Sequence, residues 1–149
     1  MPIKNYSESD YRQVLKVYAA CKLDELKQEP QTFFLCPLQN DPVRHHYIFT
    51  SKIYTWQENG AIVAFGALKN NEIRSLYVLQ DYRGLGIGRR LLEHMLKRCK
   101  EPAELFVAQS NNKAKQLYQE YGFDVVESFE TEYNGLKVTA QRMQTRAVK

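Results

Sequence analysis

Hydrophobic and polar positions change period several times along this chain, and each change predicts a different secondary-structure element. Three β-rich runs occupy residues 53–57, 61–69 and 72–79. Glu58-Asn59-Gly60 separates the first two runs and Asn70-Asn71 separates the second and third, and both segments are typical of tight turns. These runs therefore predict an antiparallel three-stranded meander in the middle of the chain.

The second half of the chain alternates helical and extended patterns. Residues 91–100 carry an apolar stripe that predicts a helix, and residues 104–108 predict a strand that a helical crossover would place parallel to the strand at 72–79. Residues 111–121 predict another helix, ended by Gly122. Two strands at 124–133 and 136–143 follow, joined by Asn134-Gly135, which is a strong hairpin signal.

The first 51 residues are less regular. Residues 2–6 predict a strand, and Ser7-Glu8-Ser9-Asp10 supplies capping residues for a helix that runs to about Cys21. Residues 24–29 predict a second short helix, and the proline-interrupted segment 30–51 predicts a partly helical excursion of the length that often carries function. Together the elements predict an α+β fold, α/β-like in its crossovers, with a mixed, mostly antiparallel sheet of about seven strands and helices on both faces.

Composition narrows the class of protein. The chain has 149 residues, 44% of them hydrophobic and 26% charged, which predicts a single domain spanning 1–149. It carries no apolar run long enough to span a bilayer and no apolar signal core near Met1, so we expect a cytoplasmic protein without membrane contact. A net charge of +4 without a dense basic tract argues against nucleic-acid binding. Three widely spaced cysteines argue against a disulfide framework and a thiolate metal site, and we expect no metal.

Residues 81–90 place three alternate glycines between a predicted strand and a predicted helix. Backbone N–H groups at a helix start can face an anion, and glycine lets the backbone approach that anion with no Cβ in the way. The segment lacks the Lys-Ser or Lys-Thr of a P-loop and the Gly-x-Gly-x-x-Gly of a dinucleotide-binding fold. It therefore predicts either a site for some other phosphorylated ligand or a glycine-rich turn without a ligand.

Two motifs then occur in a familiar order. Residues 83–88 read Arg-Gly-Leu-Gly-Ile-Gly directly after the strand that contains Leu76-Tyr77-Val78, and residues 111–123 read Asn-x-x-Ala-x-x-x-Tyr-x-x-x-Gly-Phe. The first is similar to the Arg/Gln-x-x-Gly-x-Gly/Ala signature of the GNAT superfamily of acyl-CoA-dependent N-acetyltransferases, and the second is similar to that family's second motif. The predicted element order also resembles this family's sheet over nearly the whole chain. Residues 23–51, which usually shape the acceptor site, are not specified by the resemblance.

The resemblance implies an N-acetyltransferase that moves an acetyl group from acetyl-CoA to a primary amine by direct transfer. The backbone edge of the strand at 72–79 would bond the pantetheine arm, and the amides at 84–89 would face the pyrophosphate. The cofactor-binding residues implied are Leu76, Tyr77, Val78, Arg83, Gly84, Leu85, Gly86, Ile87, Gly88, Arg89, Asn111 and Tyr118.

Two side chains are implied in catalysis. Tyr118 would act as general acid to the coenzyme sulfur, since a phenol with a pKa near 10 is protonated at neutral pH. Glu72 opens the central strand, near where some members of the family carry a glutamate that deprotonates the amine through water. The backbone N–H of Val78 would polarise the thioester carbonyl.

The acceptor stays open at this level. Antibiotic amines, polyamines, amino acids, peptide N-termini and lysine side chains are all compatible with the family, and the aromatic and basic character of residues 33–47 weakly favours a small polar or aromatic amine. His45 and His46 receive no role. The alternative function is a non-catalytic acyl-CoA-binding or regulatory module, and the C-terminal strands could pair across a homodimer.

Overall fold

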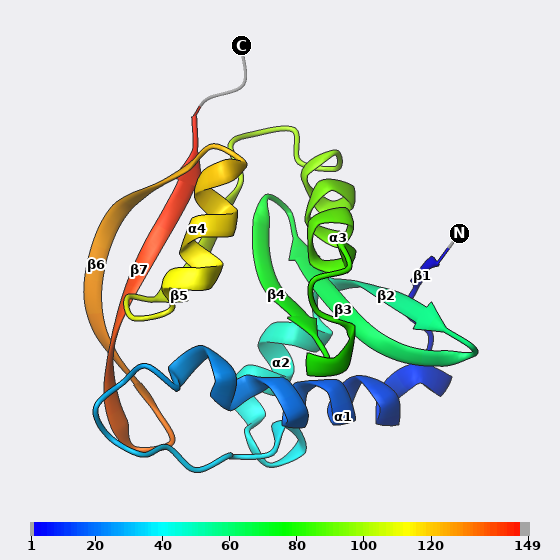
Figure 1. Ribbon diagram of the computed structural model, residues 1–149, viewed down its shortest axis with the longest axis horizontal. Helices are drawn as coiled ribbons and strands as arrows, with labels where there is room; N and C mark the ends of the chain where they lie inside the picture. The colour runs from blue at the N-terminus through cyan, green and yellow to red at the C-terminus, as the bar shows by residue number, and fades with distance from the viewer. Residues whose placement is uncertain (1, 147–149) are drawn as a thin grey trace.

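A seven-stranded sheet forms the centre of the computed structural model, which describes residues 2–146 (Figure 1). The strand order is β1-β2-β3-β4-β5-β7-β6, and among the strand pairs described only β4 and β5 are parallel. The strands are β1 (Ile3–Asn5), β2 (Lys52–Glu58), β3 (Ala61–Lys69), β4 (Glu72–Val78), β5 (Glu104–Ala108), β6 (Phe123–Tyr133) and β7 (Leu136–Thr145). The predicted mixed, mostly antiparallel sheet is confirmed.

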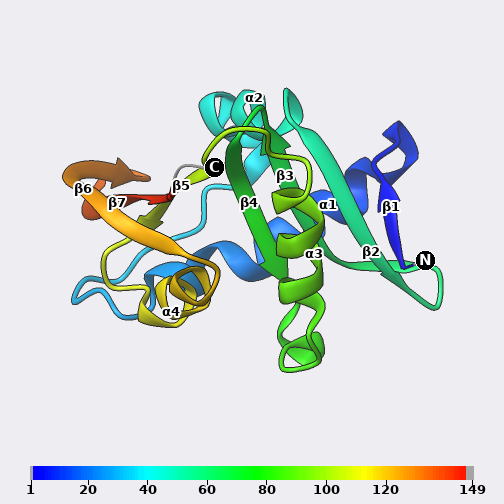
Figure 2. The same ribbon diagram turned by 90° about the horizontal axis from the view of Figure 1, so that it is seen from above.

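Helices cover both faces of the sheet, as the sequence predicts (Figure 2). The α-helices are α1 (Tyr11–Cys21), α2 (Pro42–Phe49), α3 (Ile87–Leu96) and α4 (Asn112–Glu120), and the 3-10 helices are η1 (Glu8–Asp10), η2 (Lys22–Leu26), η3 (Leu38–Asn40) and η4 (Gln80–Tyr82). Side chains of α1 and α2, such as Val14 and Ile48, pack with Phe65 of β3 in one core. Side chains of α3, such as Leu92, pack with Phe123 and Met143 in the core on the other face.

Local chemistry sets the ends of these elements. Asn59, Asn70 and Asn134 adopt positive φ at the three hairpin turns, where asparagine tolerates the left-handed conformation. The backbone N–H of Ser7 donates to the Asp10 carboxylate at 2.9 Å before α1. The carboxylate of Asp41 accepts from Arg44 N and caps α2.

Two details differ from the sequence-based prediction. Residues 24–29 do not form a separate helix; the chain instead continues from α1 into η2, which ends at Leu26, well before Pro30. The third α-helix ends at Leu96 rather than Lys100. The segment 30–51 contains η3 and α2 and is partly helical, as the sequence predicts. The predicted domain limits 1–149 include positions 1 and 147–149, which lie outside the described residues. Within residues 2–146, no helix is long and apolar enough to cross a membrane.

The pairing between β4 and β5 is short. Their register covers only Glu72 with Glu104 and Ile73 with Leu105, after which the two strands diverge. Figure 1 shows β3, β4 and α3 on one side of this divergence and α4 with β5, β6 and β7 on the other. The sheet therefore contains a split at its centre, and this split positions the candidate site.

Candidate functional site

A cavity of about 750 Å³ fills the split between β4 and β5. Its walls come from six parts of the chain: η2, α2, β4, the glycine turn with α3, β5 with α4, and the β6–β7 hairpin. This volume lies within the usual range of about 300–1,000 Å³ for a small-molecule site. The cavity is therefore lined both by residues of the two sequence motifs and by residues of the segment 23–51, which the family resemblance does not specify.

Beyond Ile73, the edge of β4 that faces β5 has no partner strand, and it lines the cavity. Leu79 N donates to Val63 O on the β3 side at 2.9 Å. Because N–H directions alternate along a strand, the amides of Leu76 and Val78 face the opposite edge, towards the diverged β5. An extended ligand can add to this edge as an extra strand.

The glycine turn forms the next part of the wall. Gly84 and Gly86 have φ values of +79° and +85°, and a Cβ built on either glycine meets no protein atom within 4 Å. Gly86 is the N-cap of α3, and its carbonyl oxygen accepts a backbone hydrogen bond from Arg90 N at 3.1 Å. The amides of residues 87–89 therefore point out of the helix start, where an anion is favoured.

The arginines of this motif already have protein partners. Arg83 donates through Nε to Val78 O and through a terminal nitrogen to Asp24 Oδ2, both at 2.8 Å. This contact ties η2 to the end of β4. Arg89 pairs with Glu120 at 2.6 Å and so links α3 to α4 across the mouth of the cavity. Leu85 is 69% exposed and does not line the cavity.

Tyr118 lies inside the cavity on α4. Its ring packs edge-on against Phe123, with ring centroids 5.8 Å apart, and its hydroxyl forms no hydrogen bond to another residue within 2–146. Burial, and to a smaller extent the charge of Glu25, raises the pKa of the Tyr118 phenol above its ordinary value. Asn111 caps the same helix, since its Oδ1 accepts from Ala114 N at 3.4 Å.

Glu25 is a cavity residue that the sequence reasoning missed. It sits on η2, accepts a hydrogen bond from Tyr77 Oη at 2.8 Å and pairs with Lys22 Nζ at 3.2 Å. Burial and the Glu25 charge raise the pKa of Tyr77 well above its ordinary value. No spacing signal marked Glu25, because its place depends on how η2 folds against β4.

Glu72 lies outside the cavity lining. Tyr47 Oη donates to one of its oxygens, and Arg74 Nε donates to the other at 3.0 Å. Arg74 also donates to Tyr47 O at 2.9 Å, and its guanidinium lies 4.2 Å from the centroid of the Tyr47 ring. Tyr47 and Arg74 do line the cavity, so Glu72 supports that wall from behind.

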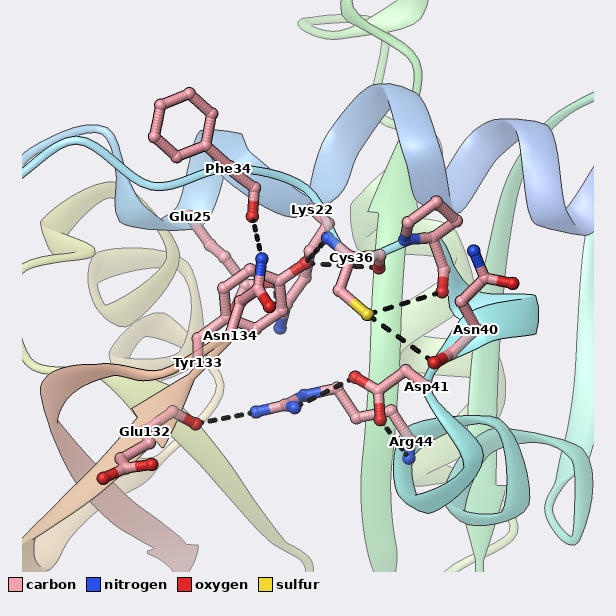
Figure 3. Close-up of polar contacts among 11 residues, drawn as sticks. Lys22, Glu25, Phe34, Cys36, Asn40, Asp41, Arg44, Glu132, Tyr133 and Asn134 are labelled. Carbon is pink, nitrogen blue, oxygen red and sulfur yellow. Dashed lines mark hydrogen bonds and ion pairs between the residues drawn. The ribbon is translucent and has the colours of Figure 1, made fainter.

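The tip of the β6–β7 hairpin is bound to the excursion (Figure 3). Tyr133 Oη accepts from Cys36 N at 2.8 Å, and Asn134 Nδ2 donates to Phe34 O at 2.9 Å. Arg44 donates to Glu132 O at 3.0 Å and lies 4.9 Å from the centroid of the Tyr133 ring. Arg44, Glu132 and Tyr133 line the cavity, so these contacts hold part of its wall in place.

The structure thus brings together most of the residues implied by the two motifs. Of the predicted site residues, only Leu85 and Glu72 do not line the cavity. His45 and His46 do not line it either; His45 Nε2 instead bonds Tyr11 Oη at 2.9 Å. Within the described range, no three His, Cys, Asp or Glu side chains gather in a metal-binding group.

Several known proteins are similar to this chain. An N-acetyltransferase of Archaeoglobus fulgidus is 41% identical over 58 residues, which are 36% of this chain and 40% of that protein, so the match spans about two fifths of the relative's length. A GCN5-related N-acetyltransferase structure from Rhodopseudomonas palustris matches with a TM-score of 0.76 at 15% identity, over 96% of this chain and 93% of that one. A phosphinothricin acetyltransferase from Sinorhizobium meliloti, solved in complex with AcCoA, matches with a TM-score of 0.70 at 17% identity, over 99% and 89%.

The structural matches show a shared fold, since their sequence identity is low. The sequence model of the acetyltransferase (GNAT) domain matches residues 21–145, which span most of the chain and contain both motifs and the split between β4 and β5. The chain therefore belongs to the GNAT acetyltransferase family.

Proposed function

We propose that the protein is an N-acetyltransferase that moves an acetyl group from acetyl-CoA directly to a primary amine. The observation that carries this proposal is one cavity that holds a strand edge without a partner strand, a free helix N-terminus and a half-buried phenol. Membership of the GNAT family supports it, as does the structural neighbour solved with AcCoA.

The cavity wall fits the donor in two places. The amides of Leu76 and Val78 can bond the amide groups of a pantetheine arm. The turn at 84–89 offers amides and open space at glycine for a pyrophosphate, with the positive end of the α3 dipole behind it. When bound, acetyl-CoA supplies a thioester whose acetyl group a neutral amine can accept.

Tyr118 and Val78 each donate a hydrogen bond or a proton to the thioester of the acetyl donor. The Val78 N–H donates to the carbonyl oxygen that gains negative charge during transfer. Tyr118 Oη donates its proton to the sulfur as the carbon–sulfur bond breaks. Its raised pKa keeps the phenol protonated until this step, and the cavity gives the hydroxyl room to meet a ligand atom.

The amine must lose a proton, and two carboxylates are candidates for taking it. Glu72, implied by the resemblance, remains a prediction; both of its oxygens are engaged by Tyr47 and Arg74 outside the cavity lining. Glu25 lines the cavity and lies close enough to Tyr118 for its charge to influence the phenol. We therefore assign the general-base role to Glu25, with Glu72 as the second candidate.

A direct test is the formation of acetylated amine and free thiol from acetyl-CoA with a panel of amines. Tyr118→Phe should lower kcat by roughly 100-fold or more while keeping acetyl-CoA affinity, because general acid catalysis contributes about 10²–10⁴-fold. Tyr121→Phe is the matched control, since Tyr121 Oη donates to Glu93 and does not line the cavity.

Acetyl-CoA binding without product from any amine would instead favour the alternative, a non-catalytic acyl-CoA-binding module. Absence of binding would contradict both proposals. A cytoplasmic location remains a prediction, and so does a homodimer, for which β6 provides a sheet edge.

A further inference from the structure

One end of the cavity, here called the acceptor end, is formed by α2, Arg74 and the β6–β7 hairpin. It presents two arginines whose paired carboxylates do not line the cavity. Arg44 and Arg74 both line the cavity, whereas their partners Asp41 and Glu72 do not. Arg44 pairs with Asp41 at 3.1 Å and Arg74 pairs with Glu72 at 3.0 Å. Each carboxylate therefore holds its arginine from outside the cavity lining, while the arginine itself lines the cavity.

Both guanidiniums are held in place and keep donors to spare. Arg44 donates to Asp41 and to Glu132 O, and Arg74 donates to Glu72 and to Tyr47 O. A guanidinium has more N–H groups than these bonds use, and its planar fork matches a carboxylate. Each also lies over a tyrosine ring, which fixes its plane (Figure 3 shows Arg44 beside Tyr133).

The two arginines belong to one continuous wall. Arg44 and Tyr47 are one helical turn apart on α2, and Arg74 lies over the Tyr47 ring at 4.2 Å. Ser75, next to Arg74, also lines the cavity, and its buried Oγ has no hydrogen-bond partner within residues 2–146. A buried hydroxyl without a partner is uncommon in proteins, and a polar ligand atom can provide one.

The cavity lining also carries the opposite charge. Glu25 lines the cavity and accepts a hydrogen bond from Tyr77 Oη at 2.8 Å, and its charge contributes to the raised pKa of Tyr118. The acceptor end thus offers a carboxylate for an amine and guanidiniums for an anion. The bonds between the hairpin tip and the excursion hold Tyr133 in the wall at that end of the cavity.

We propose that the acceptor is a small amine that also carries a carboxylate, as a free amino acid does, with the carboxylate bound by Arg44 and Arg74. This inference rests on the proposed acetyl transfer and names the class of acceptor for the same site. A polyamine or a long uncharged peptide would bring no anion to the remaining N–H groups of these two guanidiniums.

The test compares matched acceptors with the unaltered protein. Each of a set of L-amino acids is assayed beside its own carboxamide, at equal concentrations of neutral amine because the carboxamide has the less basic amine. Spermidine and an amidated tripeptide form two further arms. We expect kcat/KM to favour the free carboxylate by roughly 10- to 100-fold, as a charge-assisted hydrogen bond would give.

Variants then locate the preference. Arg44→Gln and Arg74→Gln should each bring the ratio of carboxylate to carboxamide towards one, mainly through KM. Arg98→Gln is the control, because Arg98 also lies over a tyrosine ring, that of Tyr54, but is outside the cavity lining. The wild-type comparison stands even if a variant does not fold.

The outcomes separate the two proposals. Acetylated product with equal or faster turnover of carboxamides, spermidine or the tripeptide would overturn the carboxylate acceptor and leave the acetyltransferase proposal in place. A carboxylate preference that survives both arginine variants would also overturn it. No product from any amine would count against the acetyltransferase itself.

Discussion

Replacing Gly86 by alanine tests two properties of the glycine turn at residues 84–88. One is the left-handed backbone conformation of Gly86, and the other is the open space beside it. Gly86 caps α3 with φ at +85°, and a Cβ there would point into space free of protein atoms. An L-residue in the left-handed region costs about 1–2 kcal/mol. The unliganded Gly86→Ala protein should therefore melt roughly 2–8 °C lower, at about 2–4 °C per kcal/mol for a chain of this size.

The methyl group should also weaken acetyl-CoA binding, because it occupies the space proposed for the pyrophosphate. Acetyl-CoA at 100-fold above Kd stabilises the protein by about 2.7 kcal/mol. If Kd rises tenfold, the same concentration stabilises the variant by only about 1.4 kcal/mol. Thermal unfolding without acetyl-CoA measures the loss of stability, and the shift on adding acetyl-CoA measures the loss of binding.

Two other glycines serve as controls. Gly60 has φ at +80° in the β2–β3 turn, so Gly60→Ala should lower the melting temperature of the unliganded protein without changing the acetyl-CoA-induced shift. A Cβ on Gly88 would contact Val78 Cγ2 at 3.7 Å, an ordinary distance directed at the protein, so Gly88→Ala should keep both stability and binding. An acetyl-CoA-induced shift in Gly86→Ala equal to that of the wild type would mean that the bound coenzyme does not occupy the space beside Gly86.

Three further predictions concern the cavity. Burial and the charge of Glu25 raise the pKa of Tyr118 above its ordinary value of about 10. In a pH profile, kcat should therefore rise as the amine deprotonates and show no decrease at any pH below about 10; a decrease near pH 8 would argue against this phenol as the acid. Glu25→Gln should lower kcat more than Glu72→Gln in stopped assays at pH 7, and the reverse order would return the base role to Glu72. Tyr133→Phe removes the acceptor of the Cys36 N–H and should cost about 1 kcal/mol, seen as a lower urea midpoint; an unchanged midpoint would mean that this bond does not hold the hairpin.

Much of the fold could be predicted because its signals are local. The turns at Asn59-Gly60 and Asn134-Gly135 and the apolar stripe of α3 mark their elements directly. The strand Ala61–Lys69 has the bounds expected from its sequence. The parallel pairing of β4 and β5 could be predicted from a helical crossover, which constrains the direction of the next strand.

The acceptor end could not be predicted in the same way. Glu25 reaches the cavity because η2 continues α1 and is tied to β4 by Arg83. Arg44 reaches it because the hairpin tip, 88 residues away at Glu132, binds its guanidinium. Such long-range contacts leave no periodicity in the sequence, and the motif itself gave no sign that Arg83 would point towards Asp24 rather than towards the glycine turn.

Amide hydrogen exchange, resolved by residue and followed during an acetyl-CoA titration, tests most directly whether the split between β4 and β5 holds the donor. Acetyl-CoA should slow exchange at Leu76, Val78 and the turn amides at 86–89, which face the cavity, and leave the β2–β3 turn at Asn59 unchanged. Saturation with acetyl-CoA and unchanged exchange at Val78 and at 86–89 would contradict the account.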